Sequence, residues 1–498
     1  MTGHLFVLHG RIESLVHDAA IISSDDRFKI EDHWKRLSRS YPKNPAPWAE
    51  PEDWPQRGWG RVSDEVWAVS IGGSSALEYE AILNRLSSVL QEIATTLEHE
   101  IPKGDRALPL IALPFIGLGG TGYGDQRGEV ISDLLDWADE NVAVHNIDLA
   151  LVTPESSVYA AAQQTRLQNH ASEETSSPDA ARSPHGLAKL ARMRGLALLT
   201  GAGIGVPAGL PTWPKLLERL STDAEGLDVE AIKQLSLVDQ ATLIEMQDQE
   251  DFRAHVGKII REATTPSLLH VLLAGLNIHE VVTTNYDTLY EDAVASTDLD
   301  QGIALPWTAC KVGDPWILKL HGDVNHQDDI ILTRRHMLRY DADNRPSGSV
   351  LQSLLLTRHV LMIGVSLTDD NVIRLASEVQ DYQKAHHLPA KILGTLLDVS
   401  GDDIRAKLWE KQISWVPMEG ETLPQRARSL ELFLDEMAMH ASEDSAWVLD
   451  PRFAGLLAPD EQTLAEEARS LATRLDGEKW KAIKAVLKQH GAPTTKSE

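Results

Sequence analysis

Apolar and polar positions along the first 162 residues predict an α/β domain. Short apolar runs of strand length alternate with longer stretches that have the spacing of amphipathic helices. The expected helices lie around Glu78–Glu98 and Glu129–Asp139, and the expected strands are Leu5–Leu8, Val66–Ile71, Leu108–Pro114 and Asp148–Val152. Because strands that alternate with helices are typical of a largely parallel sheet, residues 1–162 are expected to form a domain with helices on a mainly parallel sheet.

A polar stretch separates this region from a second α/β pattern. Residues 163–185 are rich in Ser, Thr, Glu, Ala and Pro without apolar periodicity, which is typical of a linker. The second pattern, over residues 186–420, begins with a helix near Gly186–Arg194 and contains a helical insert at about 214–265. Its expected strands are Leu196–Thr200, Glu280–Thr283, Trp316–Leu320, His359–Ile363 and Lys391–Leu397. This pattern predicts a second parallel sheet.

Residues 421–498 are expected to form a mainly helical C-terminal region. Asp460–Leu475 and Lys479–Gln489 both have amphipathic spacing. A single apolar stripe on such a helix packs more often on its own domain than on another chain. We therefore expect the stripe in the first stretch to be buried within this protein; its members are Leu464, Ala468, Leu471 and Leu475.

Composition narrows the classes of function. The chain has 74 acidic and 47 basic residues, for a formal net charge of -27, which disfavours direct binding to nucleic acid. Cys310 is the single cysteine, so one chain can form neither an internal disulfide nor a thiolate zinc cluster. Since no signal peptide and no apolar run of membrane-spanning length is apparent, we expect a soluble cytoplasmic protein without membrane contact.

A glycine-rich turn follows the first strand of the second pattern. Leu196–Pro211 reads LALLTGAGIGVPAGLP, in which an apolar strand runs directly into Gly201, Gly203 and Gly205. Glycines at such a turn let the backbone approach a pyrophosphate closely. The turn alone is a weak signal for a nucleotide site, because a tight turn in any α/β domain can have a similar glycine-rich sequence. An ordinary dinucleotide-binding dehydrogenase is disfavoured, because no third glycine follows at the usual spacing and no acidic residue ends the next strand.

Three later strands also end in polar residues. Val281–Asp287 reads VVTTNYD, Ile317–Asn325 reads ILKLHGDVN, and Val360–Asn371 reads VLMIGVSLTDDN. In open parallel sheets, ligands bind at the carboxyl edge, where these polar residues fall. A single strand-end histidine is more often structural than catalytic, but four successive strands with such ends favour one shared site.

The order of these motifs resembles the sirtuin superfamily over about 230 residues. The shared features are a GAG loop, a T-x-N-x-D strand end, a strand followed by HG, and G-x-S. The resemblance implies a Rossmann-type sheet with NAD at its edge, and His321, Asn285 and Asp287 as catalytic residues. The NAD-binding residues that it implies are Gly201, Ala202, Gly203, Pro211, Trp213, Thr284, Gly322, Gly364, Ser366 and Asp398.

The chemistry of these side chains suits cleavage of the nicotinamide–ribose bond. Breaking that bond builds positive charge on the sugar, which the oxygens of Asn285 and Asp287 could stabilise. A histidine titrates near neutral pH, so His321 is suited to orient or deprotonate a ribose hydroxyl or an incoming water.

Three departures separate this sequence from the protein-deacylase members of that superfamily. Deacylases generally carry a zinc ribbon of four cysteines, and this chain has one cysteine, so no zinc is expected. Gly209–Pro214 reads GLPTWP where deacylases have G-I-P-x-F-R, and the strand end reads TTNYD in place of TQNID. The variants resemble the sirtuin-like domains of bacterial anti-phage effectors, which hydrolyse NAD. An NAD hydrolase is therefore favoured over a non-catalytic NAD or ADP-ribose sensor, and over a deacylase.

The N-terminal domain resembles a macrodomain, the ADP-ribose-binding α/β/α module. Gly10–Asp25 and Pro114–Gly124 (PFIGLGGTGYG) carry the resemblance, and the second implies a loop that wraps a diphosphate. Arg11 and Asp25 stand where the family has Asp and Asn, so hydrolytic activity of this domain is not expected. A scaffold for assembly or trigger recognition remains an alternative. The implied ADP-ribose loop comprises Gly117, Gly119, Gly120, Thr121, Gly122 and Tyr123.

The combined layout is that of a nucleotide sensor joined to an NAD-consuming effector. Because uncontrolled NAD loss would kill the host, we expect the enzyme to be silent until it is triggered, as in abortive infection. Activation through homo-oligomer assembly, through a protein trigger, or through ADP-ribose or a cyclic derivative at the N-terminal domain is expected.

Overall fold

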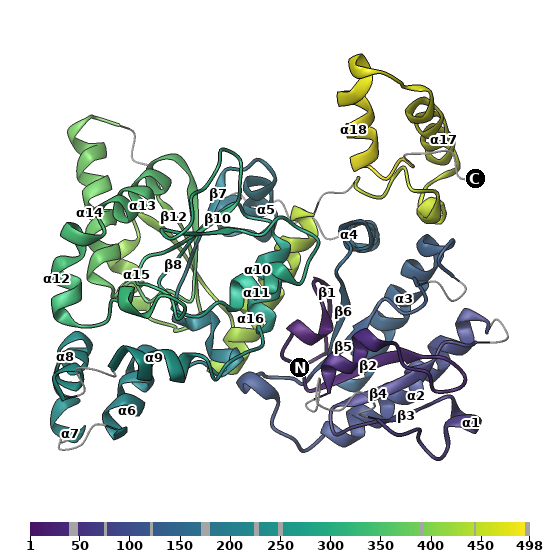
Figure 1. Cartoon of the computed structure of the whole chain (residues 1–498), viewed down its shortest axis with the longest axis horizontal. Helices are drawn as coiled ribbons and strands as arrows, with labels where there is room; N and C mark the ends of the chain where they lie inside the picture. The colour runs from purple at the N-terminus through teal and green to yellow at the C-terminus, as the bar shows by residue number, and fades with distance from the viewer. Residues whose placement is uncertain are drawn as a thin grey trace. The chain divides into compact units, whose positions relative to one another are not determined.

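The computed structural model describes residues 1–38, 48–73, 77–119, 123–170, 180–223, 229–247, 252–388, 392–442 and 445–493. The chain divides into two compact units, each of which is described by itself. The first contains Met1–Ser176, Ser296–Asp298 and Ser442–Glu498, and the second contains Ser177–Ala295 and Leu299–Ala441. Both units are α/β structures, in agreement with the expectation from the sequence (Figure 1).

The first unit is built on a six-stranded sheet in the order β1-β6-β5-β2-β4-β3. All neighbouring strands are parallel except β3 and β4, which form an antiparallel edge. The strands are β1 Leu5–His9, β2 Ala19–Ser24, β3 Trp59–Arg61, β4 Val66–Ser70, β5 Leu110–Pro114 and β6 Asp148–Thr153. All five residues of β1 are buried, because a parallel sheet is covered on both faces.

Helices on this sheet supply the rest of the core of the first unit. The long helices α2 and α3 contribute apolar residues to one cluster with the strands. The helices of this part are α1 Trp54–Arg57, α2 Tyr79–Leu97, α3 Arg127–His145 and α4 Ser156–His170.

The expected linker at 163–185 is wrong in its first part, because α4 continues to His170. The polar side chains that suggested a linker are buried against strand β1. Gln163 donates to the carbonyl of Val7 at 3.3 Å, and Arg166 donates to the carbonyl of Leu5 at 3.0 Å. Buried polar groups that find backbone acceptors are stable in a core, and composition alone does not reveal them.

The expected single C-terminal region at 421–498 is also wrong, because it divides between the units. α16 (Leu423–Ala441) belongs to the second unit, whereas the chain from Ser442 onward belongs to the first. Trp447 and Phe453 of this later part are 3% and 0% exposed within the core of the first unit. Two further helices follow, α17 (Pro459–Arg474) and α18 (Lys481–Gln489).

The buried side of α17 differs from the stripe expected from the sequence. Ala465, Ala472 and Leu475 are buried, whereas Leu464 and Leu471 are 64% and 41% exposed. Ala465 and Ala472 pack in one small apolar cluster with Leu449 and with Leu487 of α18. Their small side chains allow the two helices to approach closely.

The second unit is a seven-stranded, all-parallel sheet in the order β13-β12-β11-β7-β8-β10-β9. The order of the strands reverses between β7 and β11, which makes their carboxyl ends a topological switch point. The strands are β7 Leu196–Thr200, β8 Glu280–Thr283, β9 Ile303–Leu305, β10 Trp316–Lys319, β11 His359–Ile363, β12 Gly394–Asp398 and β13 Ile413–Pro417.

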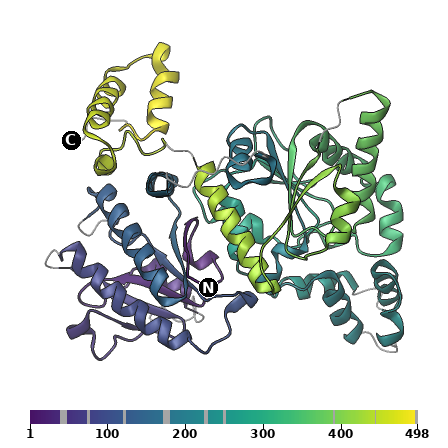
Figure 2. The same ribbon diagram turned by 180° about the vertical axis from the view of Figure 1, so that it is seen from behind.

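Helices cover both faces of the second sheet, as Figure 1 shows. α16 lies along α5 and α10 on one face, where Figure 2 shows it from behind. This face includes α5 Pro184–Arg192, α10 Leu268–Gly275 and α11 Leu289–Ala295; the other includes α12 Arg334–Asp343, α13 Arg345–Thr357, α14 Asp370–Ala385 and α15 Asp403–Trp409. The helical insert expected at 214–265 falls on α6 Trp213–Asp223, α7 Val229–Ile232, α8 Leu237–Gln247 and α9 Phe252–Ile260.

Within the described ranges, no helix combines the length and the apolar character needed to cross a membrane.

Replacement of Phe453 by Ala is expected to destabilise the first unit by about 3–5 kcal/mol, because it opens a cavity in that unit's core. Calorimetry of the full chain should show a lower transition temperature for the first unit. Ile101→Ala is the control, because Ile101 is 86% exposed and its replacement should leave the transition almost unchanged. An unchanged transition in Phe453→Ala would show that the C-terminal segment is dispensable for the first core.

Candidate active site at the carboxyl edge of the second sheet

The loops that follow β7 and β11 are in direct contact at the switch point. The amide of Gly201 donates to the carbonyl of Ile363, and the amide of Gly203 donates to the carbonyl of Gly364, both at 3.1 Å. A Cβ atom at Gly203 would lie 2.7 Å from Gly364 Cα, and one at Gly364, whose φ is +67°, would lie 2.6 Å from the amide nitrogen of Ile204. Glycine is therefore required on both sides for the two loops to approach each other.

The loop after β8 brings two of the expected catalytic residues to the same edge. Asn285 and Asp287 are 8% and 7% exposed and line one small pocket. The backbone amide of Asn285 donates to Thr283 Oγ1 at 3.1 Å, and Asp287 Oδ1 accepts the backbone amide of Leu289 at the start of α11 at 3.0 Å. These bonds fix the loop, so the two side chains are held at the edge by the backbone that follows the strand.

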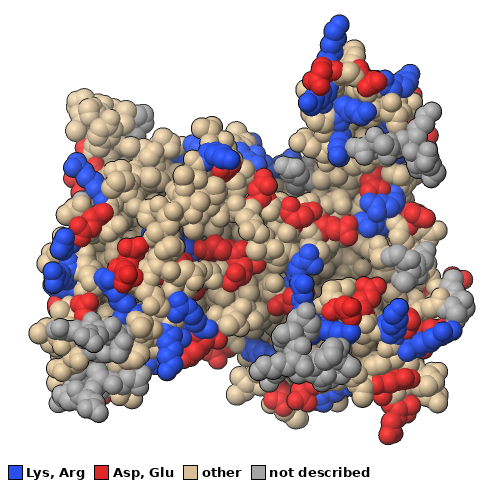
Figure 3. All heavy atoms as spheres, viewed as in Figure 1, with Lys and Arg blue, Asp and Glu red and all other residues tan. Residues whose placement is uncertain are grey.

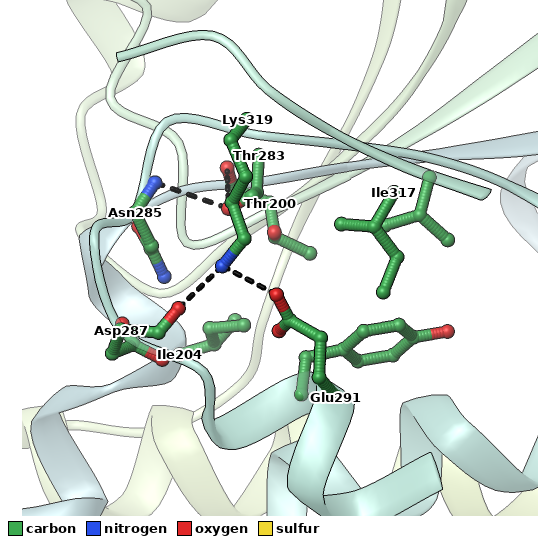
Figure 4. Close-up of a pocket in the computed structure, with 10 residues that line it drawn as sticks. Thr200, Ile204, Thr283, Asn285, Asp287, Glu291, Ile317 and Lys319 are labelled. Carbon is green, nitrogen blue, oxygen red and sulfur yellow. Dashed lines mark hydrogen bonds and ion pairs between the residues drawn. The ribbon is translucent and has the colours of Figure 1, made fainter. Parts of the chain in front are cut away.

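A buried lysine lies beside this loop, and Figure 4 shows its amine pointing toward Asp287 and Glu291. Lys319, the last residue of β10, has a side chain that is 1% exposed. Its Nζ lies 2.5 Å from Glu291 Oε1, 3.0 Å from Asp323 Oδ2 and 2.5 Å from the carbonyl oxygen of Asp287, to which it donates. The ammonium thus connects α11, the loop after β10 and the loop that carries Asp287.

The charge of Lys319 is maintained despite its burial. Burial by itself lowers the pKa of a lysine, but the carboxylates of Glu291, Asp323 and Asp287 outweigh this effect and raise the pKa of Lys319 above its ordinary value. Lys319 is therefore a cation at neutral pH, and the pocket lined by Asn285 and Asp287 has an internal positive charge.

His321 follows β10 and faces an acidic residue from the neighbouring loop. It is 5% exposed, and its Nε2 lies 3.2 Å from Asp369 Oδ2, although the two groups are not aligned as a hydrogen bond. The other oxygen of Asp369 caps α14 by accepting the amides of Asn371 and Val372 at 2.9 and 3.0 Å. Because the helix end fixes the carboxylate, it is placed to orient a histidine that gains a proton.

Tyr286, in the loop after β8, connects this loop to the chain that follows β10. Its hydroxyl donates to the carbonyl of Ile331 at 2.9 Å, and burial, with the nearby carboxylate of Asp369, raises its pKa well above the ordinary range. Tyr286 is therefore a neutral structural hydrogen-bond donor in this position.

A second buried histidine, His270 on α10, supports the glycine loop. Its Nδ1 accepts the amide of Ser267 at 3.1 Å, and Ser267 Oγ donates to the carbonyl of Ile204 at 3.1 Å. Burial lowers the pKa of His270 to about 4; Asp287 opposes this effect and Lys319 adds to it. Since Nδ1 is an acceptor, the neutral ring holds its proton on Nε2, which has no hydrogen-bond partner among the described atoms.

The remaining expected NAD-binding residues lie at the same edge or beside it. Ser366 is exposed, and its hydroxyl lies 2.6 Å from that of Thr368. Asp398, at the end of β12, is 7% exposed, and its oxygens accept the amides of Ser400 and Gly401, the Ser400 hydroxyl and Trp415 Nε1. Four internal donors nearly saturate a carboxylate, so Asp398 holds the loop after β12 in place.

The other expected members are distributed over three loops. Ala202 is exposed in the glycine turn, Thr284 donates its amide to the carbonyl of Thr200 at 3.1 Å, and Gly322 has a φ of +91° directly after His321. Pro211 and Trp213 are half-buried at the start of the helical insert, where the indole nitrogen of Trp213 has no partner among the described atoms.

Sequence reasoning missed four residues of this region: Lys319, Asp369, Glu291 and His270. The lysine within the apolar run ILKL was an available signal, because a buried lysine needs paired carboxylates. The partner of His321 was not readable, since Asp369 is 48 positions away and meets it only in the folded sheet. In the described ranges, no group of three or more His, Cys, Asp or Glu side chains is arranged to hold a metal ion.

Replacement of His270 by Gln should flatten the pH dependence of stability. Unfolding raises the pKa of His270 from about 4 to its ordinary 6.5. As the pH falls, the unfolded chain therefore takes up this proton before the folded chain does. The stability that is present above pH 6.5 is lost as the pH falls toward 4. This histidine accounts for about 3 kcal/mol of that loss. Gln at this position can keep the capping bond to Ser267, because Ser-x-x-Gln is a capping box.

Denaturant unfolding between pH 7.5 and about pH 4.5 measures the effect. The exposed His99→Gln is the matched control and should follow the wild-type curve. Parallel curves for wild type and His270→Gln would rule out His270 as a source of acid sensitivity.

Comparison with known proteins relates part of the second unit to one family. Residues 279–414 match the SIR2-like domain family, a range that includes Asn285, Asp287, His321, Gly364 and Asp398. "NAD(+) hydrolase ThsA" of Bacillus cereus (strain MSX-D12) is 30% identical over 37% of this chain and 40% of the relative. The protein of the same name from Enterococcus faecium is 29% identical over 38% and 42%, and that from Acinetobacter baumannii (strain 532279) is 29% identical over 37% and 39%.

The matched region therefore spans about two fifths of the length of these curated relatives. The family match begins at β8 and extends into β13, so it covers the loops that carry Asn285, Asp287 and His321. Residues 279–414 of the second unit are therefore similar to the SIR2-like domain family.

Proposed function

We propose that this chain hydrolyses NAD at the nicotinamide–ribose bond and releases nicotinamide and ADP-ribose. The observation that carries the proposal is the joint placement of Asn285, Asp287 and His321 at the carboxyl edge, within the range that matches the SIR2-like family. The relatives named NAD(+) hydrolase support the same reaction, since they align with this chain at about 30% identity.

In the proposed reaction, the bond between ribose C1′ and the nicotinamide nitrogen breaks, and its electron pair leaves with nicotinamide. The sugar ring becomes cationic, and the oxygens of Asn285 and Asp287 stabilise that charge from the loop after β8. Water then forms the new bond to C1′ and loses its proton to His321, whose Nε2 lies 3.2 Å from Asp369 Oδ2. The glycine turn after β7 and the loop after β11 hold the diphosphate and adenosine parts of NAD.

The biological role that we propose is a regulated NAD-depleting effector of bacterial anti-phage defence, and it acts through abortive infection. Similarity to a protein named "Defense-associated sirtuin 2" of Bacillus subtilis, 21% identical over 39% of this chain, supports this role. Control by a homo-oligomer, a protein trigger or a nucleotide fits an enzyme whose unregulated activity would be lethal. A non-catalytic NAD sensor and an NAD-dependent deacylase are the alternatives that the first experiment separates.

Purified chain should release nicotinamide from NAD without any acylated peptide. His321→Ala and Asn285→Ala should each lower turnover by at least about 100-fold, the usual contribution of a general base or a charge-stabilising group. The exposed His386→Ala is the control and should retain activity. Chromatographic measurement of nicotinamide across a range of protein concentrations also reports activation by assembly.

Each contrary outcome has a distinct meaning. Binding of NAD without turnover at any protein concentration would identify a sensor. Turnover only with an acylated peptide would identify a deacylase, and full activity of His321→Ala would remove His321 from the mechanism.

We further propose that the N-terminal unit is a macrodomain-like module that binds ADP-ribose or a cyclic derivative at the loop after β5. Two features support this site: Gly117 has a φ of +99°, and Arg127 at the start of α3 donates to the carbonyl of Leu118. Tyr123 donates from its hydroxyl to the carbonyl of Leu77, and Gly119 has open space where a Cβ would be. Gly120, Thr121 and Gly122 lie outside the described residues.

Titration calorimetry of the full chain with ADP-ribose tests this module. Gly117→Val should weaken binding at least about tenfold, because valine is strained at this φ and its Cβ would lie 3.1 Å from the Tyr79 ring. Gly195→Ala is the matched control, since the nearest atom would lie at an ordinary 3.5 Å. Absence of heat with ADP-ribose and with its cyclic forms would favour the alternative, a scaffold for assembly.

A further inference from the structure

The pocket that Asn285 and Asp287 line also contains the carboxylate of Glu291 on α11, as Figure 4 shows. The side chain of Glu291 is 22% exposed, and its Oε1 lies 2.5 Å from Lys319 Nζ. The reaction proposed for this edge uses Asn285, Asp287 and His321. Glu291 is therefore a pocket residue to which that reaction gives no role.

The buried charges around Lys319 do not balance. One ammonium faces three carboxylates, which belong to Glu291, Asp323 and Asp287 and which all raise the pKa of the lysine. Negative charge is therefore in excess beside the pocket. Buried charge without an opposite charge is costly, so an excess of this kind is more typical of a binding site than of a structural ion pair.

The ionisation of Glu291 reflects the same excess. Burial raises the pKa of Glu291, Lys319 opposes this effect, and the carboxylate of Asp287 adds to it. The other titratable groups that interact with this cluster are Asp292 on α11, Asp323 after β10 and His270 on α10. A positive charge that enters the pocket would reduce the repulsion among the carboxylates and favour the ionised form of Glu291.

An organic cation suits this pocket better than a metal ion. Lys319 Nζ is in contact with both Glu291 and Asp323, which leaves no place for a metal ion between these two carboxylates. The proposed substrate supplies an organic cation, because oxidised NAD has a positive charge on its nicotinamide ring, whereas the corresponding ring of NADH is neutral. The two dinucleotides share their diphosphate and adenosine parts, so the charge of this ring is the main difference that the pocket can recognise.

We propose that Glu291 is a specificity-determining residue, whose carboxylate makes this pocket select the cationic nicotinamide end of oxidised NAD over the neutral end of NADH. The inference rests on the proposed function in one respect, which is the placement of the nicotinamide ribose beside Asn285 and Asp287. Glu291 acts through its charge, and the ion pair with Lys319 holds its carboxylate at the pocket. The same charge favours the cationic sugar that forms when the nicotinamide–ribose bond breaks.

Surface charge does not supply this selectivity. Figure 3 shows acidic and basic side chains interspersed on the face that it draws, in a chain whose formal net charge is -27. Exposed charges are screened by water and salt, whereas buried charges are screened much less. The side chains of Lys319 and Asp323 are 1% and 5% exposed, so the charge that a bound nicotinamide ring meets is the buried one.

Binding of two ligands that cannot lose nicotinamide by this reaction tests the proposal on the full chain. One is a carbocyclic NAD analogue, in which a methylene group replaces the ring oxygen of the nicotinamide ribose and the ring charge is kept. The other is NADH. Titration calorimetry at about pH 8 should show the cationic analogue binding at least about tenfold more tightly than NADH. Glu291→Gln should lower this ratio at least about fivefold, because glutamine keeps the size of the side chain and an acceptor for Lys319 but removes the charge.

Asp292→Asn is the matched control. Asp292 is an acidic residue of the same helix that is exposed and does not line the pocket. Its replacement removes the same charge at almost the same place in the sequence, and the ratio should stay within about twofold of wild type. Circular dichroism should be unchanged in both variants, because neither substitution alters the size of the side chain.

A pH series on the wild type tests the same charge without a substitution. Because the pKa of Glu291 is raised, this carboxylate takes up a proton as the pH falls. The preference for the cationic analogue should therefore be largest near about pH 8 and decline toward about pH 5.5. The decline should be absent in Glu291→Gln and present in Asp292→Asn. Groups that contact the shared diphosphate and adenosine parts affect both ligands alike, so their titration cancels in the ratio.

Three results would overturn the proposal. The first is a wild-type chain that binds neither ligand or binds both equally. The second is a wild-type ratio in Glu291→Gln, which would make Glu291 a structural partner of Lys319 and nothing more. The third is a wild-type ratio that does not change with pH. A chain that prefers the cationic analogue but releases no nicotinamide from NAD would refute the proposed hydrolase and leave this inference standing, so the two failures are distinct.

Discussion

The buried ammonium of Lys319 is the interaction on which the rest of the candidate site depends. Taking a lysine out of water costs several kcal/mol, and the cost is offset only where carboxylates and hydrogen bonds surround it. Here Glu291 and Asp323 supply the opposite charge, while the carbonyl of Asp287 accepts a hydrogen bond. Because these partners come from a helix and two separate loops, their geometry cannot relax independently, and Asp287 is fixed from below.

The switch point adds a second constraint of a steric kind. Gly201, Gly203 and Gly364 allow the loops after β7 and β11 to touch through backbone atoms, and two backbone hydrogen bonds hold the loops together. A ligand that spans the carboxyl edge therefore meets a preformed surface, and little ordering cost is paid when it binds. The buried charge of Lys319 and the glycine contacts between the two loops together preorganise the pocket.

The sequence predicted the parts of this structure that depend on local pattern. Apolar runs that end in glycine, Asn285 or His321 identified the strands and their carboxyl ends, because alternation and turn chemistry are local properties. It failed where burial depends on distant partners. Gln163 and Arg166 looked like linker residues but bind the backbone of β1, and Phe453 looked like part of a tail but fills the core of the first unit.

The pairing of His321 with Asp369 shows which part of the candidate site the sequence could predict and which part it could not. Asp369 has two roles: one oxygen caps α14, and the other lies 3.2 Å from the imidazole. The first role is visible in sequence as an acidic turn before a helix, and the second requires β10 and β11 in their final places. Because a helix end holds the carboxylate, any motion of α14 moves this carboxylate relative to the imidazole. In the proposed hydrolase, control through that helix would therefore act on the neighbour of His321 and on the loop after β11 together, because Asp369 belongs to that loop.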